Sequence, residues 1–110
     1  MPEQTTLHLP EKYAIQVREL LRQHMPDAEV WAYGSRVRGD HYDASDLDLV
    51  AHFPPTQHDK ITYLIETDEA FRESNLPIIV QILDWDRIPA SFQDEIRAGY
   101  VVVQKGRHTT

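Results

Sequence analysis

Two aspartates, Asp46 and Asp48, and a preceding Gly34-Ser35 pair are the residues best suited to chemistry in this 110-residue chain. Alternate residues of a β-strand point to the same side, so both carboxylates would share one face of a strand. Neighbouring carboxylates repel each other unless a cation lies between them. Hard oxygen ligands suit Mg²⁺, which also takes oxygens from substrate phosphates. The pair indicates a magnesium site, although a solvated edge strand shows the same pattern.

The Gly34-Ser35 pair lies where an expected strand gives way to a short helix. Backbone N–H groups at the start of a helix favour an anion such as phosphate, and glycine lets a ligand approach the backbone closely. Ser35 adds a hydroxyl donor, and the guanidinium groups of Arg36 and Arg38 can each fork onto phosphate oxygens. We expect a phosphate-binding turn, with either arginine facing inward. Taken alone, the segment also fits an ordinary turn with two surface arginines.

The spacing of the two motifs makes the combination more specific. Ten residues, 36–45, separate Gly34-Ser35 from Asp46-Leu47-Asp48. That length accommodates a phosphate-binding turn, a loop and a neighbouring strand that carries the acids. The pattern resembles the signature of the DNA polymerase β-type nucleotidyltransferase superfamily, and within it the minimal nucleotidyltransferase (MNT) family. The resemblance covers nearly the whole chain, including the segments WAYGSRVRG, SDLDLV and YVVVQ.

The resemblance implies a reaction and a partner. Asp46 and Asp48 would be the catalytic residues and hold two Mg²⁺ ions, while Gly34 and Ser35 would grip the phosphates of ATP with help from Arg36 or Arg38. The reaction would transfer AMP from ATP to a hydroxyl. Family members of this size are antitoxins paired with a helical HEPN-domain ribonuclease toxin. The implied acceptor is a tyrosine of that toxin.

One position departs from the family pattern. The family has a third acidic residue on a later strand, where this sequence has Gln81. Glutamine is neutral and cannot act as a general base. Asp84 is three residues further on, so strand alternation directs it to the opposite face. The loop residues Asp40 and Asp43 are weaker substitutes. We therefore expect weakened transfer activity.

Two other functions remain open at this point. A domain with a glutamine at the third position could bind nucleotide and neutralise its partner by occlusion alone. It could also be the nucleotidyltransferase subunit of a small-molecule enzyme that works with a helical partner. Mg²⁺-dependent transfer of a nucleotide label to a protein separates these readings from protein adenylylation.

Composition excludes several other classes. The chain has 11 basic and 18 acidic residues and a net charge of −7, which disfavours direct nucleic-acid binding because few cations are available to replace phosphate counterions. It has no cysteine, which excludes disulfides, thiolate zinc sites and cysteine nucleophiles. No apolar run approaches the ~20 residues of a membrane span. We expect a cytoplasmic protein.

The expected elements form an α/β (α+β) domain with a small mixed β-sheet flanked by helices. We expect one nucleotidyltransferase domain over residues 9–105, with polar tails at 1–8 and 106–110. The second long helix should place Ile61, Leu64, Ile65 and Phe71 on one side. The expected helices cover 10–25, 36–38, 57–73 and 92–98, and the expected strands cover 29–33, 46–53, 78–83 and 100–103.

Overall fold

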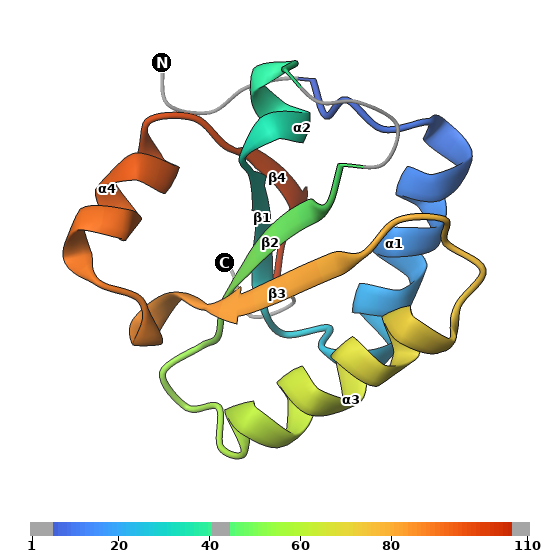
Figure 1. The fold of residues 1–110 in the computed structure, drawn as a ribbon. Helices are drawn as coiled ribbons and strands as arrows, with labels where there is room; N and C mark the ends of the chain where they lie inside the picture. The colour runs from blue at the N-terminus through green and yellow to red at the C-terminus, as the bar shows by residue number, and fades with distance from the viewer. Residues whose placement is uncertain (1–5, 41–44, 107–110) are drawn as a thin grey trace.

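A four-stranded mixed sheet forms the centre of the computed structural model, which describes residues 6–40 and 45–106 (Figure 1). Its strand order is β3-β2-β1-β4. Strand β1 pairs antiparallel with β2 and β4, and β2 pairs parallel with β3. The strands are β1 (Glu29–Tyr33), β2 (Leu47–His52), β3 (Val80–Asp84) and β4 (Val101–Gln104).

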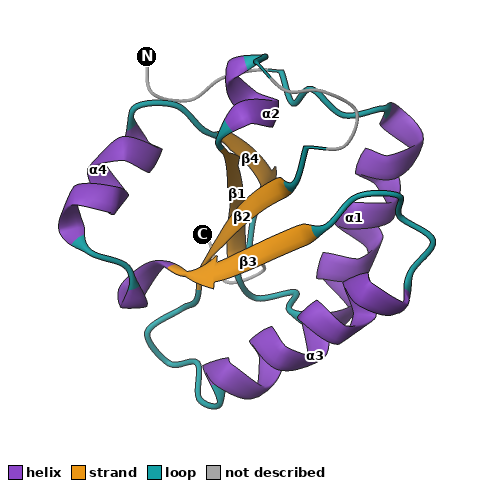
Figure 2. Cartoon of the chain, viewed as in Figure 1, coloured by secondary structure: helices purple, strands orange, loops and turns teal. Residues whose placement is uncertain are grey.

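Helices cover both faces of this sheet (Figure 2). The long helices α1 and α3 contact each other, and their buried side chains join the strands in the hydrophobic core. Helix α4 contacts the other face, where the Phe92 ring meets the Tyr33 ring edge-on at 5.6 Å between centroids. The helices are α1 (Glu11–His24), α2 (Ser35–Arg38), α3 (Lys60–Glu73) and α4 (Ala90–Arg97), with a 3₁₀ turn, η1 (Trp85–Arg87), after β3.

Strand alternation determines which side chains face the core. In β1, Val30 and Ala32 are fully buried, whereas Tyr33 lies half-buried on the opposite face. The register pairs Tyr33 with Asp48 of β2, and Asp48 with Gln81 of β3. Three polar side chains from three adjacent strands therefore lie side by side on the face that α4 partly covers.

The predicted fold class is confirmed, and the predicted elements occur in the expected order. The predicted helix over 57–73 begins later, at Lys60. Its predicted apolar side is wrong in part, because Ile61 and Ile65 are 52% and 53% exposed. At about 100° per residue, Ile65 lies roughly 120° around the helix from Phe71. The buried stripe instead follows Thr67 and Phe71.

The described ends of the chain pack onto the domain. Leu7 packs against the hydrophobic core, and the His8 backbone N–H donates to the Arg36 carbonyl at 2.7 Å. Gly106 is buried at the other end. Leu7, His8 and Gly106 belong to the segments expected as polar tails, and the domain bounds 9–105 stay a prediction. Among the described residues, no helix is long and apolar enough to span a membrane.

Candidate active site

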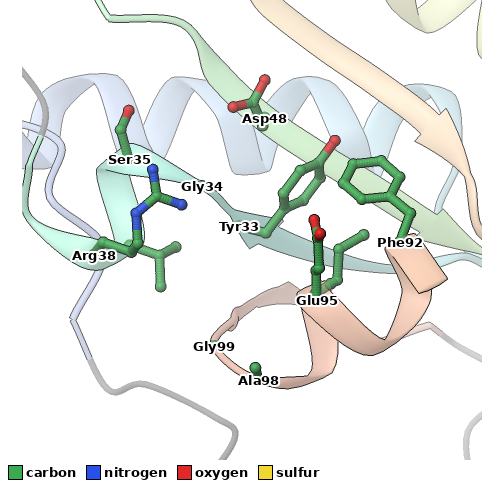
Figure 3. Close-up of a pocket in the computed structure, with 11 residues that line it drawn as sticks. Tyr33, Gly34, Ser35, Arg38, Asp48, Phe92, Glu95, Ala98 and Gly99 are labelled. Atoms are coloured by element: carbon green, nitrogen blue, oxygen red, sulfur yellow. The ribbon is translucent and has the colours of Figure 1, made fainter.

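A cavity of about 600 Å³ opens where α2, the ends of β1 and β2, and helix α4 meet. Four of the predicted site residues line it: Gly34, Ser35, Arg38 and Asp48. Figure 3 shows these residues with Tyr33, Phe92 and Glu95, which complete much of the wall. The predicted phosphate-binding turn and one carboxylate of the predicted metal site therefore share one cavity.

The backbone at Gly34 lies directly against Asp48. Gly34 adopts φ +85° and ψ −153°, a region that is essentially restricted to glycine. A Cβ atom at this position would lie 2.8 Å from Asp48 Oδ2. Only glycine allows the turn to approach the carboxylate this closely, so a phosphate held at the turn would lie next to the acidic pair.

The negative charge of the acidic pair is only partly offset by its neighbours. Burial, and then the charge of Asp46, raise the pKa of Asp48, while Arg38 lowers it. Burial, with a further contribution from Asp48, raises the pKa of Tyr33 to about 12. A divalent cation would relieve this repulsion, and carboxylate oxygens are the hard ligands that Mg²⁺ prefers. Asp46 and Asp48 therefore fit a magnesium site.

Gln81 occupies the place next to this pair that an acid would fill in the family. It lies opposite Asp48 in the β2–β3 register, and its side-chain Nε2 donates to Asp46 Oδ2 at 3.2 Å. The amide thus directs a donor, not a negative oxygen, toward the acidic pair. The described residues contain no group of three or more His, Asp or Glu side chains arranged to hold a metal ion.

Two of the proposed substitutes for a third acid, Asp84 and Asp40, make other contacts. Asp84 is buried, as strand alternation predicts, and accepts a hydrogen bond from the Asp86 backbone N–H at 3.1 Å. It also lies 4.0 Å from the Lys60 ammonium group. Asp40 is exposed and pairs with Arg38 at 3.3 Å. Asp43 lies outside the described residues.

The two arginines point in different directions. Arg38 lines the cavity, whereas Arg36 does not. Residues two apart in a helix lie about 200° apart, and the side chain of Arg36 is directed into the protein, where the residue is 3% exposed. It donates to the carbonyls of Ser45 at 3.0 Å and His8 at 2.9 Å. Arg36 thus braces the segment that leads to Asp46, and the structure does not place it at the predicted nucleotide contact.

Sequence reasoning missed the α4 side of the cavity. Phe92 and Glu95 come from a helix more than forty residues after the Asp-x-Asp motif, and no local pattern marks them. Tyr33 could have been found, because it immediately precedes Gly34 and alternation along β1 places it on the Asp48 face.

Comparison with known proteins identifies the family. The profile of the family described as "Nucleotidyltransferase domain" matches residues 14–103. That span includes the turn, both aspartates and all of the sheet except Gln104, the last residue of β4. This chain belongs to the nucleotidyltransferase domain family. The resemblance predicted from the motif spacing is therefore confirmed at the family level.

A curated relative with high sequence identity shows which members of the family this nucleotidyltransferase resembles. The "Probable protein adenylyltransferase MntA" of Haemophilus influenzae is 41% identical over 101 residues, which cover 90% of this chain and 84% of that protein. The shared region thus includes most of both chains. The predicted likeness to MntA-like nucleotidyltransferases is confirmed.

Solved structures share the fold of this nucleotidyltransferase. A toxin-antitoxin crystallised with AMP-PNP matches with a TM-score of 0.67 and 17% identity, over 86% of this chain and 74% of that one. An MntA-HepT toxin-antitoxin matches with a TM-score of 0.57 and 12% identity, over 89% and 74%. At these identities the likeness supports the fold, which agrees with the predicted mixed sheet.

Proposed function

We propose that this nucleotidyltransferase transfers AMP from ATP to a tyrosine hydroxyl of a HEPN-domain toxin, and so acts as an antitoxin. One observation carries the catalytic part of the proposal. The Gly34 turn lies against Asp48, within the contact distance of a single added carbon atom. A phosphate-binding turn and a metal-binding carboxylate in contact are what nucleotidyl transfer requires.

The chain's own residues supply most of the binding. Gly34 and Ser35 offer a close backbone approach and a hydroxyl to the terminal phosphates of ATP, and Arg38 adds a positive charge on the same wall. Asp46 and Asp48 would hold Mg²⁺. When bound, that metal neutralises phosphate charge and lowers the pKa of the acceptor hydroxyl.

The chemical step is a displacement at the α-phosphorus. The acceptor oxygen forms a bond to that phosphorus and loses its proton to solvent. The bond from the α-phosphorus to the bridging oxygen of the β-phosphate breaks, and pyrophosphate leaves with the bonding electrons. Positioning and electrostatic stabilisation supply most of the acceleration in such transfers. The fixed Gly34 turn and Arg38 would position the triphosphate, and the acidic pair would hold the metal that supplies most of the electrostatic stabilisation.

The acceptor and partner rest on the comparisons. The 41% identical relative is named as a protein adenylyltransferase. Two proteins of the same fold are described as toxin-antitoxins, one of them with the ATP analogue AMP-PNP. These likenesses support a protein acceptor and a toxin partner for this chain.

A second function is favoured by Gln81. Because this residue directs an amide donor toward Asp46, we expect the domain to bind a metal less well than a site with three acids would. In that case the chain would neutralise its partner by binding alone, with nucleotide and Mg²⁺ held but not consumed.

Two labels separate the functions. The chain is incubated with Mg²⁺ and a lysate of its source organism, with ATP labelled on either the α- or the γ-phosphate. Nucleotidyl transfer labels a protein band from α-labelled ATP only, and the mass of that band identifies the acceptor. Label from γ-labelled ATP would indicate a kinase in the lysate. If no band is labelled by a folded chain that binds Mg·ATP, the binding function replaces the proposed one.

A further inference from the structure

Helix α4 brings into the cavity a carboxylate, that of Glu95, which is not part of the acidic pair. Glu95 lines the cavity together with Asp48 and Tyr33, and Figure 3 shows its side chain extending from α4 toward Tyr33, beside Phe92. Within the described part of the chain, its carboxylate makes no hydrogen bond or ion pair. The adjacent Asp94 is different, because it pairs with Arg97 at 3.1 Å and does not line the cavity.

The strand order separates Glu95 from the third-acid place. Asp48 lies on β2, with Gln81 of β3 on one side and Tyr33 of β1 on the other. Helix α4 meets the β1 side, through the contact of Phe92 with Tyr33. Glu95 therefore does not substitute for the acid missing at Gln81, and its part of the cavity is a different subsite.

Charge restricts what this subsite can bind. A carboxylate accepts hydrogen bonds and repels phosphate, so Glu95 is unsuited to the polyphosphate that Gly34, Ser35 and Arg38 would bind. It suits a neutral group that donates. The aromatic rings of Tyr33 and Phe92 beside it offer an apolar surface to a sugar or a base. The nucleoside of ATP has both kinds of group.

We propose that Glu95 is a specificity-determining residue that accepts a hydrogen bond from the nucleoside of ATP, either from a ribose hydroxyl or from the exocyclic amino group of the base. Phe92 forms the apolar part of the same subsite. The proposal rests on the proposed function, because it assumes that the triphosphate lies at the Gly34 turn. It makes α4 the part of the chain that distinguishes a nucleotide from a bare polyphosphate.

The test measures the Kd of Mg·ATP and of inorganic tripolyphosphate with Mg²⁺ for the full chain and three variants. Glu95→Ala should raise the Kd of Mg·ATP about tenfold, the lower end expected for loss of a hydrogen bond to a charged group. It should leave tripolyphosphate binding equal or slightly tighter. Glu95→Gln keeps an acceptor oxygen, so its Kd for Mg·ATP should lie between that of the unsubstituted chain and that of Glu95→Ala. Asp94→Ala is the matched control, since it removes one negative charge from the neighbouring position.

Two analogues identify the donor. 2′,3′-dideoxy-ATP lacks both ribose hydroxyls, and purine riboside triphosphate lacks the exocyclic amino group. One analogue lacks the group that donates a hydrogen bond to Glu95. That analogue should have the same Kd for the unsubstituted chain and for Glu95→Ala. The inference is overturned if Glu95→Ala matches Asp94→Ala, if ATP and tripolyphosphate weaken together, or if neither analogue removes the difference. Absence of Mg·ATP binding by the unsubstituted chain overturns the proposed function itself, and the inference with it.

Discussion

Gln81 donates a hydrogen bond from its side-chain amide to Asp46 across the parallel pair β2–β3, at 3.2 Å. The contact partly offsets the charge of the acidic pair without adding a negative ligand. A neutral side chain at this place stabilises the site when no metal is bound. We expect the same side chain to weaken metal binding and so to limit the rate of transfer.

Gln81→Asp should therefore increase nucleotidyl transfer, by roughly tenfold, the scale on which residues around a metal site change affinity or activity. The same variant should unfold at a lower temperature in EDTA, because three carboxylates then repel one another, and Mg²⁺ should restore its stability. Transfer rate and melting temperature, with and without Mg²⁺, are the measurements. Gln81→Asn controls for side-chain length, and a Gln81→Asp variant with unchanged turnover would show that this position does not limit the reaction.

Gly34→Ala should abolish most activity and also reduce stability. The new Cβ would lie 2.8 Å from Asp48 Oδ2 in a backbone region that alanine avoids, a strain of about 1–3 kcal/mol. Displacement of the turn should reduce transfer about a hundredfold. The measurements are the free energy of unfolding in urea and the transfer rate.

Gly39→Ala is the matched control for that variant. Gly39 also has a positive φ, +90°, but its added Cβ would meet the His8 ring at 3.3 Å instead of the acidic pair. We expect a loss of about 1–2 kcal/mol in stability and an activity close to that of the unsubstituted chain. Equal loss of activity in both glycine variants would show that Gly34 acts through general backbone strain.

Substitution of Arg36 should mainly reduce stability, whereas substitution of Arg38 should mainly weaken nucleotide binding. Arg36→Ala removes a buried donor to the His8 and Ser45 carbonyls, which should cost about 2–4 kcal/mol of unfolding free energy. Arg38→Ala removes an exposed side chain from the cavity wall. It should leave stability within about 0.5 kcal/mol and raise the KM for ATP about tenfold. Urea unfolding and steady-state kinetics are measured on both variants. A stability loss in Arg38→Ala together with a raised KM for ATP in Arg36→Ala would contradict these assignments.

His52 should make the protein less stable as the pH falls below neutrality. Burial lowers the pKa of His52 from 6.5, and outweighs the opposing charges of Glu29, Asp84 and Asp86, while Arg97 lowers it further. The unfolded chain therefore binds a proton that the folded one resists, so stability is lost as the pH falls through about 6.5 toward the lower folded value.

The matched variant is His52→Phe. The ring keeps its contacts with Trp31 and Trp85, at 4.1 and 4.5 Å between centroids, and the buried Nε2, which has no hydrogen-bond partner among the described residues, is removed. Unfolding free energies measured at pH 7.5 and 5.5 should differ less in this variant than in the unsubstituted chain. An identical pH dependence in both would assign the loss to other groups.

The sequence predicted those parts of the site that local spacing determines. Gly34, Ser35 and Asp48 meet because a strand, a turn and the next strand of an antiparallel pair follow one another directly along the chain, between Glu29 and His52. The family pattern matched Gln81 to the third-acid position, and the strand register then placed it opposite Asp48. The opposite faces of Gln81 and Asp84 followed from strand alternation.

The rest depends on tertiary packing. The direction of Arg36 is fixed by two carbonyls, one of them 28 residues away along the chain, and no local pattern contains that contact. The exposure of Ile61 and Ile65 depends on how α3 is rotated against α1 and the sheet. Glu95 and Phe92 reach the cavity only because α4 folds back over the end of β1.

Asp48→Asn is the variant that most directly tests whether the acidic pair is needed for AMP transfer. Because the folded protein raises the pKa of Asp48, a neutral amide of the same shape should leave the melting temperature equal or higher. Asp68→Asn, on α3 and paired with Arg72, is the matched control. The measurement is the rate at which α-phosphate label from Mg·ATP appears on the acceptor protein. We predict that Asp48→Asn folds and loses transfer by at least a hundredfold, while Asp68→Asn keeps the normal rate. A folded Asp48→Asn variant that transfers AMP at the normal rate would contradict the account.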